Sequence, residues 1–159
     1  MIYVSVGTNK KDFSRLVKYL DVPNIKYNFY FQIGFTKYIP VNHDYFKFKE
    51  SSEIEKIISD SKFVISHGGF GILSEVIRLK KNVIIIPRLF ENGEADNDQT
   101  ELGSYLSSLY PKSIMFIRDV NDIFSSIEKI AAVSQPPEYF FQSEIPQLIN
   151  SFVSNNEKY

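Results

Sequence analysis

The sequence has no cysteine among its 159 residues and only two histidines. Without cysteine, the chain can form neither a disulfide framework nor a thiolate metal site, and its composition fits a reducing compartment. Its formal charge is only −1 and 43% of its residues are apolar. This balance is typical neither of a disordered chain nor of a basic nucleic-acid-binding surface. We therefore expect a globular domain with no nucleic-acid partner.

Long hydrophobic runs are also absent. No stretch approaches the ~20 consecutive apolar residues that span a bilayer. Residues 2–6 carry no basic leader and already have the pattern of a strand, so we expect no signal peptide. A length of 159 residues suits one main domain with a substantial core. The prediction is a soluble, cytoplasmic protein.

Short apolar runs alternate along the chain with segments of helical periodicity. Such an alternation predicts an α/β fold, a Rossmann-like and mainly parallel sheet covered by helices on both faces. Several residues have the type and spacing of helix N-caps: Asp12, Asn97 or Asp98, and a Ser52/Glu55 capping box. The predicted strands are residues 2–6, 27–33, 44–49, 62–65, 82–86 and 113–117.

Two of the predicted strands run directly into glycine-containing turns and then helices. Residues 2–6 lead to Gly7 and Thr8, and residues 62–65 lead to the segment Ser66-His67-Gly68-Gly69-Phe70-Gly71. A helix N-terminus beyond such a turn favours a phosphate. Glu75, inside the second helix, has acceptors for the vicinal hydroxyls of a ribose. The alternative is that the glycines only make a tight turn and that Glu75 complements the helix dipole. Ligands of parallel sheets sit beyond the carboxyl ends of the strands, where both turns and the polar loop 88–98 would meet.

Four segments carry recognisable motifs: Val4-Ser5-Val6-Gly7-Thr8, Gln32-Ile33-Gly34, the 66–71 turn with Glu75, and Pro87-Arg88 followed by Gly93-Glu94 and Gln99-x-Glu101-Leu102. Taken together in this order and spacing, they resemble the C-terminal domain of glycosyltransferase family 28. The resemblance is greatest to its short donor-binding subunit in two-component transferases. Such subunits serve bacterial capsule and exopolysaccharide synthesis, and one is the soluble subunit of the dolichol-linked chitobiose-forming N-acetylglucosaminyltransferase. Two family histidines are replaced, by Asp98 in the family's Asp-His-Gln element and by Ala95.

The resemblance implies a single donor-binding domain of GT-B type that binds a UDP-sugar. The sugar would pass, with inversion, to a lipid-linked saccharide, and neither a cofactor nor a metal is expected. His67 would contact phosphate, against the alternative that it only caps the turn. Arg88 would reach a phosphate or sugar, against a solvated or Asp-paired side chain. Gln99 would contact sugar hydroxyls. The predicted donor-binding residues are Gly7, Thr8, His67, Gly68, Gly69, Gly71, Glu75, Arg88 and Gln99.

No residue is a convincing general base for the acceptor hydroxyl, so the resemblance implies a membrane-anchored partner that binds the acceptor. We expect residues 1–135 to form the UDP-sugar-binding domain. Residues 136–159 would form a helical tail, either docking the partner or packing on the domain. The protein would lie at the inner face of the membrane through that partner. One alternative is a non-catalytic sugar-nucleotide-binding or scaffolding subunit. Another, a sugar-nucleotide epimerase, is disfavoured because the chain supplies half of a two-domain cleft.

Overall fold

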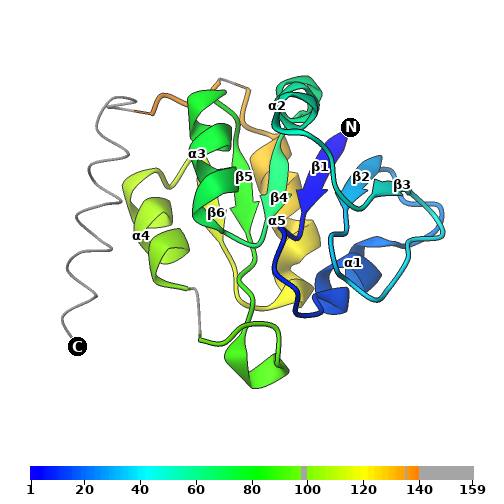
Figure 1. Cartoon of the computed structure of the whole chain (residues 1–159). Helices are drawn as coiled ribbons and strands as arrows, with labels where there is room; N and C mark the ends of the chain where they lie inside the picture. Colours follow the sequence, from blue (N-terminus) through cyan, green and yellow to red (C-terminus); the bar gives the residue numbers. More distant parts are fainter. Residues whose placement is uncertain (98–99, 135, 140–159) are drawn as a thin grey trace.

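A six-stranded sheet forms the centre of the protein (Figure 1). The structure is a computed structural model, and it describes residues 1–97, 100–134 and 136–139. Every neighbouring pair of strands is parallel, and the strand order is β3-β2-β1-β4-β5-β6. This confirms the predicted α/β class and its parallel sheet. The strands are β1 (Ile2–Ser5), β2 (Phe29–Gln32), β3 (Asp44–Phe46), β4 (Val64–Ser66), β5 (Val83–Ile85) and β6 (Ile114–Phe116).

Helices cover both faces of the sheet. On one face α1 and α5 pack together with the neighbouring η2, and on the other lie α2, α3 and α4. Figure 1 shows α3 in front of the strands, α4 to their left and α5 behind them. The helices are α1 (Ser14–Leu20), α2 (Ser51–Asp60), α3 (Phe70–Arg78), η1 (Phe90–Asn92), α4 (Glu101–Leu109), η2 (Val120–Asp122) and α5 (Ile123–Ala131).

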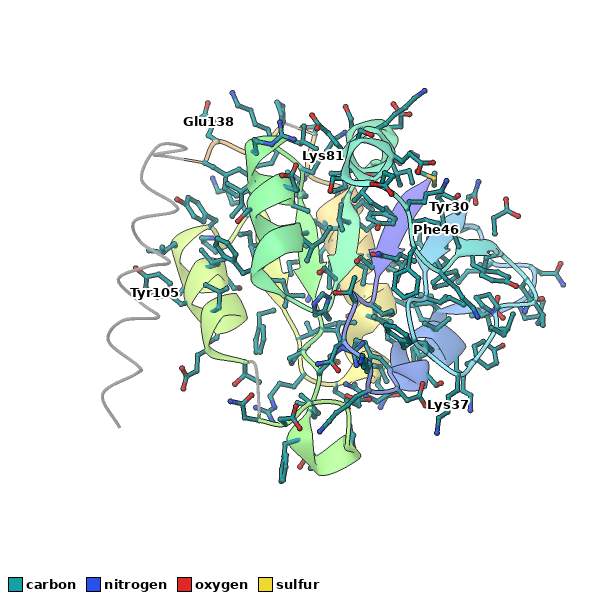
Figure 2. All side chains as sticks on the ribbon, viewed as in Figure 1. Tyr30, Lys37, Phe46, Lys81, Tyr105 and Glu138 are labelled. Carbon is teal, nitrogen blue, oxygen red and sulfur yellow. The ribbon has the colours of Figure 1, made fainter. Side chains whose placement is uncertain are left out.

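Alternation along the central strands divides the core into two layers. In β1, Ile2 and Val4 pack toward α1 and α5, whereas Tyr3 packs toward α2 and α3. In β2, Phe29 and Phe31 face the first layer. Tyr30 of β2 contacts Phe46 of β3, with 5.1 Å between their ring centroids; both are labelled in Figure 2. Side chains therefore fill both faces, as expected for a doubly covered parallel sheet.

The helix starts differ from three of the predictions. The capping box of α2 is formed by Glu50 and Glu53, two residues before the predicted Ser52/Glu55 pair. Thr100 is the N-cap of α4, so neither Asn97 nor Asp98 takes that position. The N-cap of α1 is Phe13, although Asp12 accepts hydrogen bonds from the backbone and hydroxyl of Ser14. In each case several adjacent polar residues fit the same local pattern, and tertiary packing decides between them.

The connection from β3 to β4 crosses over β1, so β1 is flanked by β2 on one side and β4 on the other. Such a change of direction opens a crevice at the carboxyl ends of the strands, where open α/β sheets bind ligands. The strand order thus predicts a site at the end of β1.

The described part of the C-terminal region packs on the domain. Tyr139 is 7% exposed, donates a hydrogen bond to the carbonyl of Lys81 (2.7 Å), and stacks edge-on against Tyr110. The predicted tail beyond Tyr139 lies outside the described residues, and its partner-docking role stays a prediction. Within the described ranges, no helix combines the length and apolar character needed to cross a membrane.

Candidate ligand-binding site

A pocket of about 600 Å³ opens at the carboxyl end of β1, between the N-terminal halves of α2 and α3. It lies at the crevice that the strand order predicts. Six of the residues that the sequence assigns to donor binding line it, from two separate segments of the chain. The lining residues are Ser5, Gly7, Thr8, Gln32, Lys49, Ser51, Ser52, Ile54, Glu55, His67, Gly69, Gly71, Ile72 and Glu75.

The imidazole of His67 occupies the space between the two glycine turns. A Cβ atom on either Gly7 or Gly69 would overlap the ring. Gly7 also has a φ of +77°, which a side chain would strain. The ring Nδ1 lies 3.4 Å from the carbonyl oxygen of Ser5. These glycines are therefore required by the histidine that they enclose.

His67 is neutral at physiological pH in this position. Burial lowers the pKa of its imidazole to about 4, and the nearby Arg88 cation adds to the effect. A neutral ring can donate one hydrogen bond and accept another, but supplies no positive charge. A contact of His67 with a phosphate would thus be a hydrogen bond from an uncharged imidazole.

Gly71 differs from Gly69 although both line the pocket. A Cβ atom on Gly71 would meet no protein atom within 4 Å. Its backbone is helical, within α3, so no unusual φ requires a glycine. Protein packing therefore gives no reason for glycine at this position. The lack of a side chain leaves room in the pocket for a ligand.

The N-terminus of α3 faces this space without a side-chain cap. Gly69 is the N-cap, and no side chain among the described residues bonds to the first turn. The first N–H groups of a helix have no intrahelical partners and carry a partial positive charge. The start of α3 is thus suited to an anion such as a phosphate, as the sequence predicts.

Two carboxylates lie on the other side of the pocket, one on α2 and one on α3. Arg78 joins them, with its Nη2 3.0 Å from Glu55 and 2.5 Å from Glu75. Glu75 is the sixth residue of α3 and not in its first turn, so the alternative of a carboxylate placed for the helix dipole is disfavoured. Both carboxylates have further lone pairs for the hydroxyls of a sugar.

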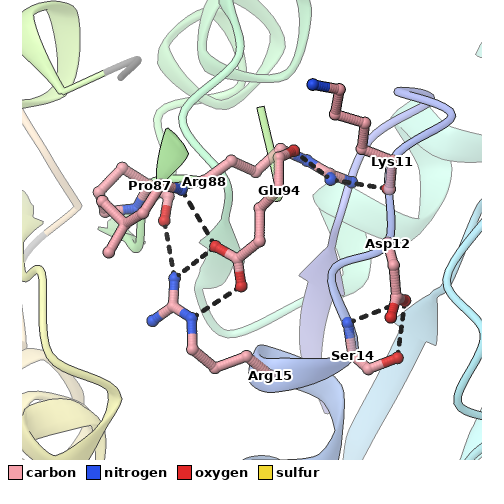
Figure 3. Close-up of polar contacts among 8 residues, drawn as sticks. Lys11, Asp12, Ser14, Arg15, Pro87, Arg88 and Glu94 are labelled. Carbon is pink, nitrogen blue, oxygen red and sulfur yellow. Dashed lines mark hydrogen bonds and ion pairs between the residues drawn. The ribbon is translucent and has the colours of Figure 1, made fainter. Parts of the chain in front are cut away.

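Arg88 is not a lining residue of the pocket, and it lies in a cluster of polar contacts among the end of β1, α1 and the loop after β5 (Figure 3). Its guanidinium donates to the carbonyls of Val6 (2.9 Å), Lys11 (2.9 Å) and Glu94 (3.1 Å), and its side chain is almost fully buried. The alternative of a solvated or Asp-paired arginine is therefore wrong. Arg88 does not line the pocket where it was expected to reach a phosphate or sugar. It joins the end of β1 to the loop that follows β5.

Glu94 completes the same cluster. Its carboxylate accepts two hydrogen bonds from Arg15, each of 2.9 Å, and one from the backbone N–H of Leu89 (3.0 Å). Arg15 also donates to the carbonyl of Pro87 (3.0 Å). Figure 3 shows these contacts joining α1 to the loop after β5. This part of the predicted functional loop 88–98 thus holds two segments of the fold together.

Gly68 and Gln99 are the remaining predicted donor-binding residues, and Gly68 does not line the pocket. Gly68 is buried with φ +87°, and a Cβ atom there would lie 2.7 Å from Ile85. Gln99 lies outside the described residues, so its sugar-binding role stays a prediction. Among the described residues, no three His, Asp or Glu side chains gather where they could hold a metal ion.

The prediction missed the pocket residues that come from β2 and α2. Gln32 has a sequence signal, since it is a polar residue at the end of the aromatic strand β2 (Phe29–Gln32). Lys49 and Glu55 have none, because only the crossover from β3 to β4 brings α2 to the edge of the pocket. Lys49 pairs with Glu53 at 2.7 Å.

Comparison with known proteins agrees with this architecture. The family model of the glycosyltransferase family 28 C-terminal domain matches residues 1–139. The match covers most of the chain, so the protein belongs to this family. It therefore has a glycosyltransferase domain, with the sheet and the crevice of a GT-B C-terminal domain. No curated protein matches the chain in sequence.

Three solved glycosyltransferase structures share the fold at low sequence identity. The glycotransferase of kitacinnamycin has a TM-score of 0.62 and 12% identity over 84% of this chain. CalG4, the calicheamicin glycosyltransferase, has a TM-score of 0.63 and 13% identity over 96%. SnogD from Streptomyces nogalater has a TM-score of 0.51 and 13% identity over 95%. The matched regions make up 35%, 38% and 43% of those chains, so this chain spans less than half their length.

Proposed function

We propose that this protein is the donor-binding subunit of an inverting glycosyltransferase. It would take a sugar from a UDP-sugar and transfer it to a lipid-linked saccharide in capsule or exopolysaccharide synthesis. The observation that supports this most is the convergence of Gly7, His67, Gly71 and Glu75 on one pocket at the strand-order switch. These residues come from two distant strand–turn–helix units, so their meeting is a property of the fold.

The pocket offers a suitable group for each part of a UDP-sugar. The diphosphate would bind the uncapped start of α3, where backbone amides stabilise the charge that develops on the departing UDP. Glu75 would accept hydrogen bonds from the ribose hydroxyls. The apolar side chains of Ile54 and Ile72 line the same pocket and suit the flat base. We expect the sugar to extend toward the loop that carries Gln99.

The second half of the active site would come from a membrane-anchored partner. Transfer needs a surface that closes over the donor and a base placed against the acceptor hydroxyl. The solved glycosyltransferases contain more than twice the length matched here. A partner subunit with the acceptor-binding domain would complete the cleft and bring this domain to a lipid-linked substrate.

Ligand selectivity tests the donor assignment directly. UDP should raise the melting temperature, because a ligand that binds only the folded state stabilises it by mass action. ADP and NAD at the same millimolar concentrations should give clearly smaller shifts. Equal shifts with ADP, or none with UDP, would remove the assignment.

Activity measurements separate the transferase from its main alternative, a non-catalytic sugar-nucleotide-binding or scaffolding subunit. With its partner, the protein should transfer sugar from a UDP-sugar to a lipid-linked acceptor, whereas alone it should be nearly inactive. A scaffold would bind UDP and leave turnover unchanged when Glu75 is replaced. Deleting residues 143–159 should abolish co-purification of the partner while UDP binding remains. Strong transfer by the isolated chain would overturn the two-subunit proposal.

A further inference from the structure

A buried glutamine forms part of the floor of the pocket. Gln32 lies in register between Ser5 of β1 and Phe46 of β3, and it is 8% exposed. It is one of the residues that line the pocket. A side-chain amide has a carbonyl acceptor at one end and two N–H donors at the other. Where a buried amide finds its partners therefore decides what it can offer a ligand.

The carbonyl end of Gln32 is already occupied by the protein. Its Oε1 accepts hydrogen bonds from the hydroxyl of Tyr3 (3.0 Å) and from that of Ser5 (2.6 Å). Both donors are buried in the sheet. Burial raises the pKa of Tyr3 well above its ordinary value, so its phenol remains protonated and able to donate. In the structure, the oxygen end of the amide therefore turns toward β1 and the nitrogen end turns away from it.

The amide nitrogen of Gln32 has no such partner. None of the hydrogen bonds in the described residues involves Nε2, although Gln32 lies between two paired strands. In the described chain, the fully enclosed side-chain polar atoms without a hydrogen-bond partner belong to Thr36, His43, Asn82 and Arg88. Nε2 of Gln32 is not one of these enclosed atoms. The nitrogen therefore reaches open space, and the space that Gln32 lines is the pocket.

We propose that Gln32 is a specificity-determining residue that binds the nucleotide through this nitrogen. This inference rests on the proposed donor site and adds a recognition group to it. Nε2 donates a hydrogen bond to an acceptor oxygen of the ligand, either a base carbonyl or a phosphate oxygen. A ligand that placed an N–H group there would leave donors facing each other, which a buried site rejects strongly.

The test uses two variants that remove the donor in different ways. Gln32→Glu keeps an oxygen for Tyr3 and Ser5 but replaces the N–H₂ group by a second oxygen. Gln32→Met removes the donor without adding charge. UDP and uridine are titrated calorimetrically into each folded variant at pH 7.5. Both variants should bind UDP on the order of tenfold more weakly, the usual effect of losing one buried hydrogen bond.

Uridine identifies the acceptor oxygen. If uridine weakens as much as UDP, the oxygen belongs to the nucleoside, and if only UDP weakens, it belongs to the diphosphate. Asn28→Asp is the matched control, because it makes the same amide-to-acid change on an exposed residue at the amino edge of the sheet. Its UDP affinity should equal that of the wild type.

The failure of this inference can be told apart from failure of the donor site. If the wild type does not bind UDP, the proposed function and the role of Gln32 fall together. If the wild type binds UDP and the folded Gln32→Met variant binds it equally well, the role of Gln32 is overturned while the donor site stands.

Discussion

Two regions at the carboxyl edge of the sheet contain residues that the sequence assigns to the same site, and the fold uses them differently. In the pocket, Gly71 leaves space and Gln32 turns a donor toward it. In the polar cluster between the end of β1, α1 and the loop after β5, Arg88 and Glu94 are buried, and their hydrogen bonds go to the protein itself. A group that spends its hydrogen bonds on buried protein partners holds the fold, whereas a group that turns a spare donor or acceptor toward a pocket is available to a ligand.

This contrast separates ligand binding from stability among neighbouring residues. Changes in the cluster should lower the free energy of unfolding and leave the affinity of folded molecules nearly unchanged. Changes in the pocket should alter the affinity for the ligand and leave the free energy of unfolding nearly unchanged. His67 belongs to both regions, since it lines the pocket and its pKa is lowered by Arg88.

The largest effect is expected from Glu94→Ala. The variant leaves Arg15 without its bidentate partner and the N–H of Leu89 without an acceptor. Glu94 is buried and Arg15 is 23% exposed, so the loss of this ion pair together with the acceptor for Leu89 should cost about 3 kcal/mol. Urea unfolding should show this loss, and the fraction that stays folded should bind UDP as the wild type does.

The control for this variant is Glu91→Ala, on an exposed residue of the same loop. Its unfolding free energy should stay within about 0.5 kcal/mol of the wild type. An equally small loss for Glu94→Ala would mean that the cluster does not hold the fold.

The next effect concerns the stability of the fold in mild acid. The folded pKa of His67 is about 4, below its ordinary value of 6.5, so the unfolded chain takes up the proton more readily. Stability should therefore fall as the pH drops from about 6.5 to 4, by about 2–3 kcal/mol from this group, and then level off. Urea unfolding across this range should give a smaller loss for His67→Gln. Identical pH profiles would show that the imidazole is not held neutral by the fold.

A smaller and more local effect is expected from Glu75→Ala. Loss of the carboxylate should weaken UDP binding by about 1–3 kcal/mol, the usual range for a charge-assisted hydrogen bond. Stability should change little, because Arg78 keeps its contact with Glu55. Glu128→Ala removes an exposed carboxylate paired with Lys26 and serves as the control. Calorimetry in which both variants bind UDP like the wild type would assign Glu75 a structural role only.

The predictable part of the fold is the part that local patterns determine. Residues 83–86 form an uninterrupted apolar run and contain β5, and the inward residues of α5, such as Ile123 and Ile127, follow helical spacing. The α2 capping box was misplaced because Ser52/Glu55 and Glu50/Glu53 have the same spacing. Nothing within one helix chooses between them.

The less predictable part depends on contacts between distant segments. Arg88 bonds to the carbonyls of Val6 and Lys11, which lie 82 and 77 residues earlier in the chain. No local pattern shows whether such an arginine faces a ligand or the protein. The sequence marks Gln32 only as the end of a strand, because the orientation of its amide depends on Tyr3 and Ser5 on the next strand. The turn at 66–71 was predictable since one segment contains both its glycines and its helix start.

The smallest and most discriminating change is Gly71→Ala. A Cβ atom at this position meets no protein atom, and the residue lies inside α3, where alanine is favoured over glycine by about 0.5–1 kcal/mol. The free protein should therefore become more stable by about that amount. The added methyl group would occupy the pocket beside the start of α3, so UDP should bind more weakly and raise the melting temperature less than in the wild type.

Gly103→Ala is the contrasting control, because its Cβ atom would lie 2.8 Å from Phe116 and should destabilise the protein without altering UDP affinity. If Gly71→Ala stabilises the protein and UDP affinity is unchanged, the ligand does not occupy the space above α3, and the phosphate would have to bind elsewhere along the pocket.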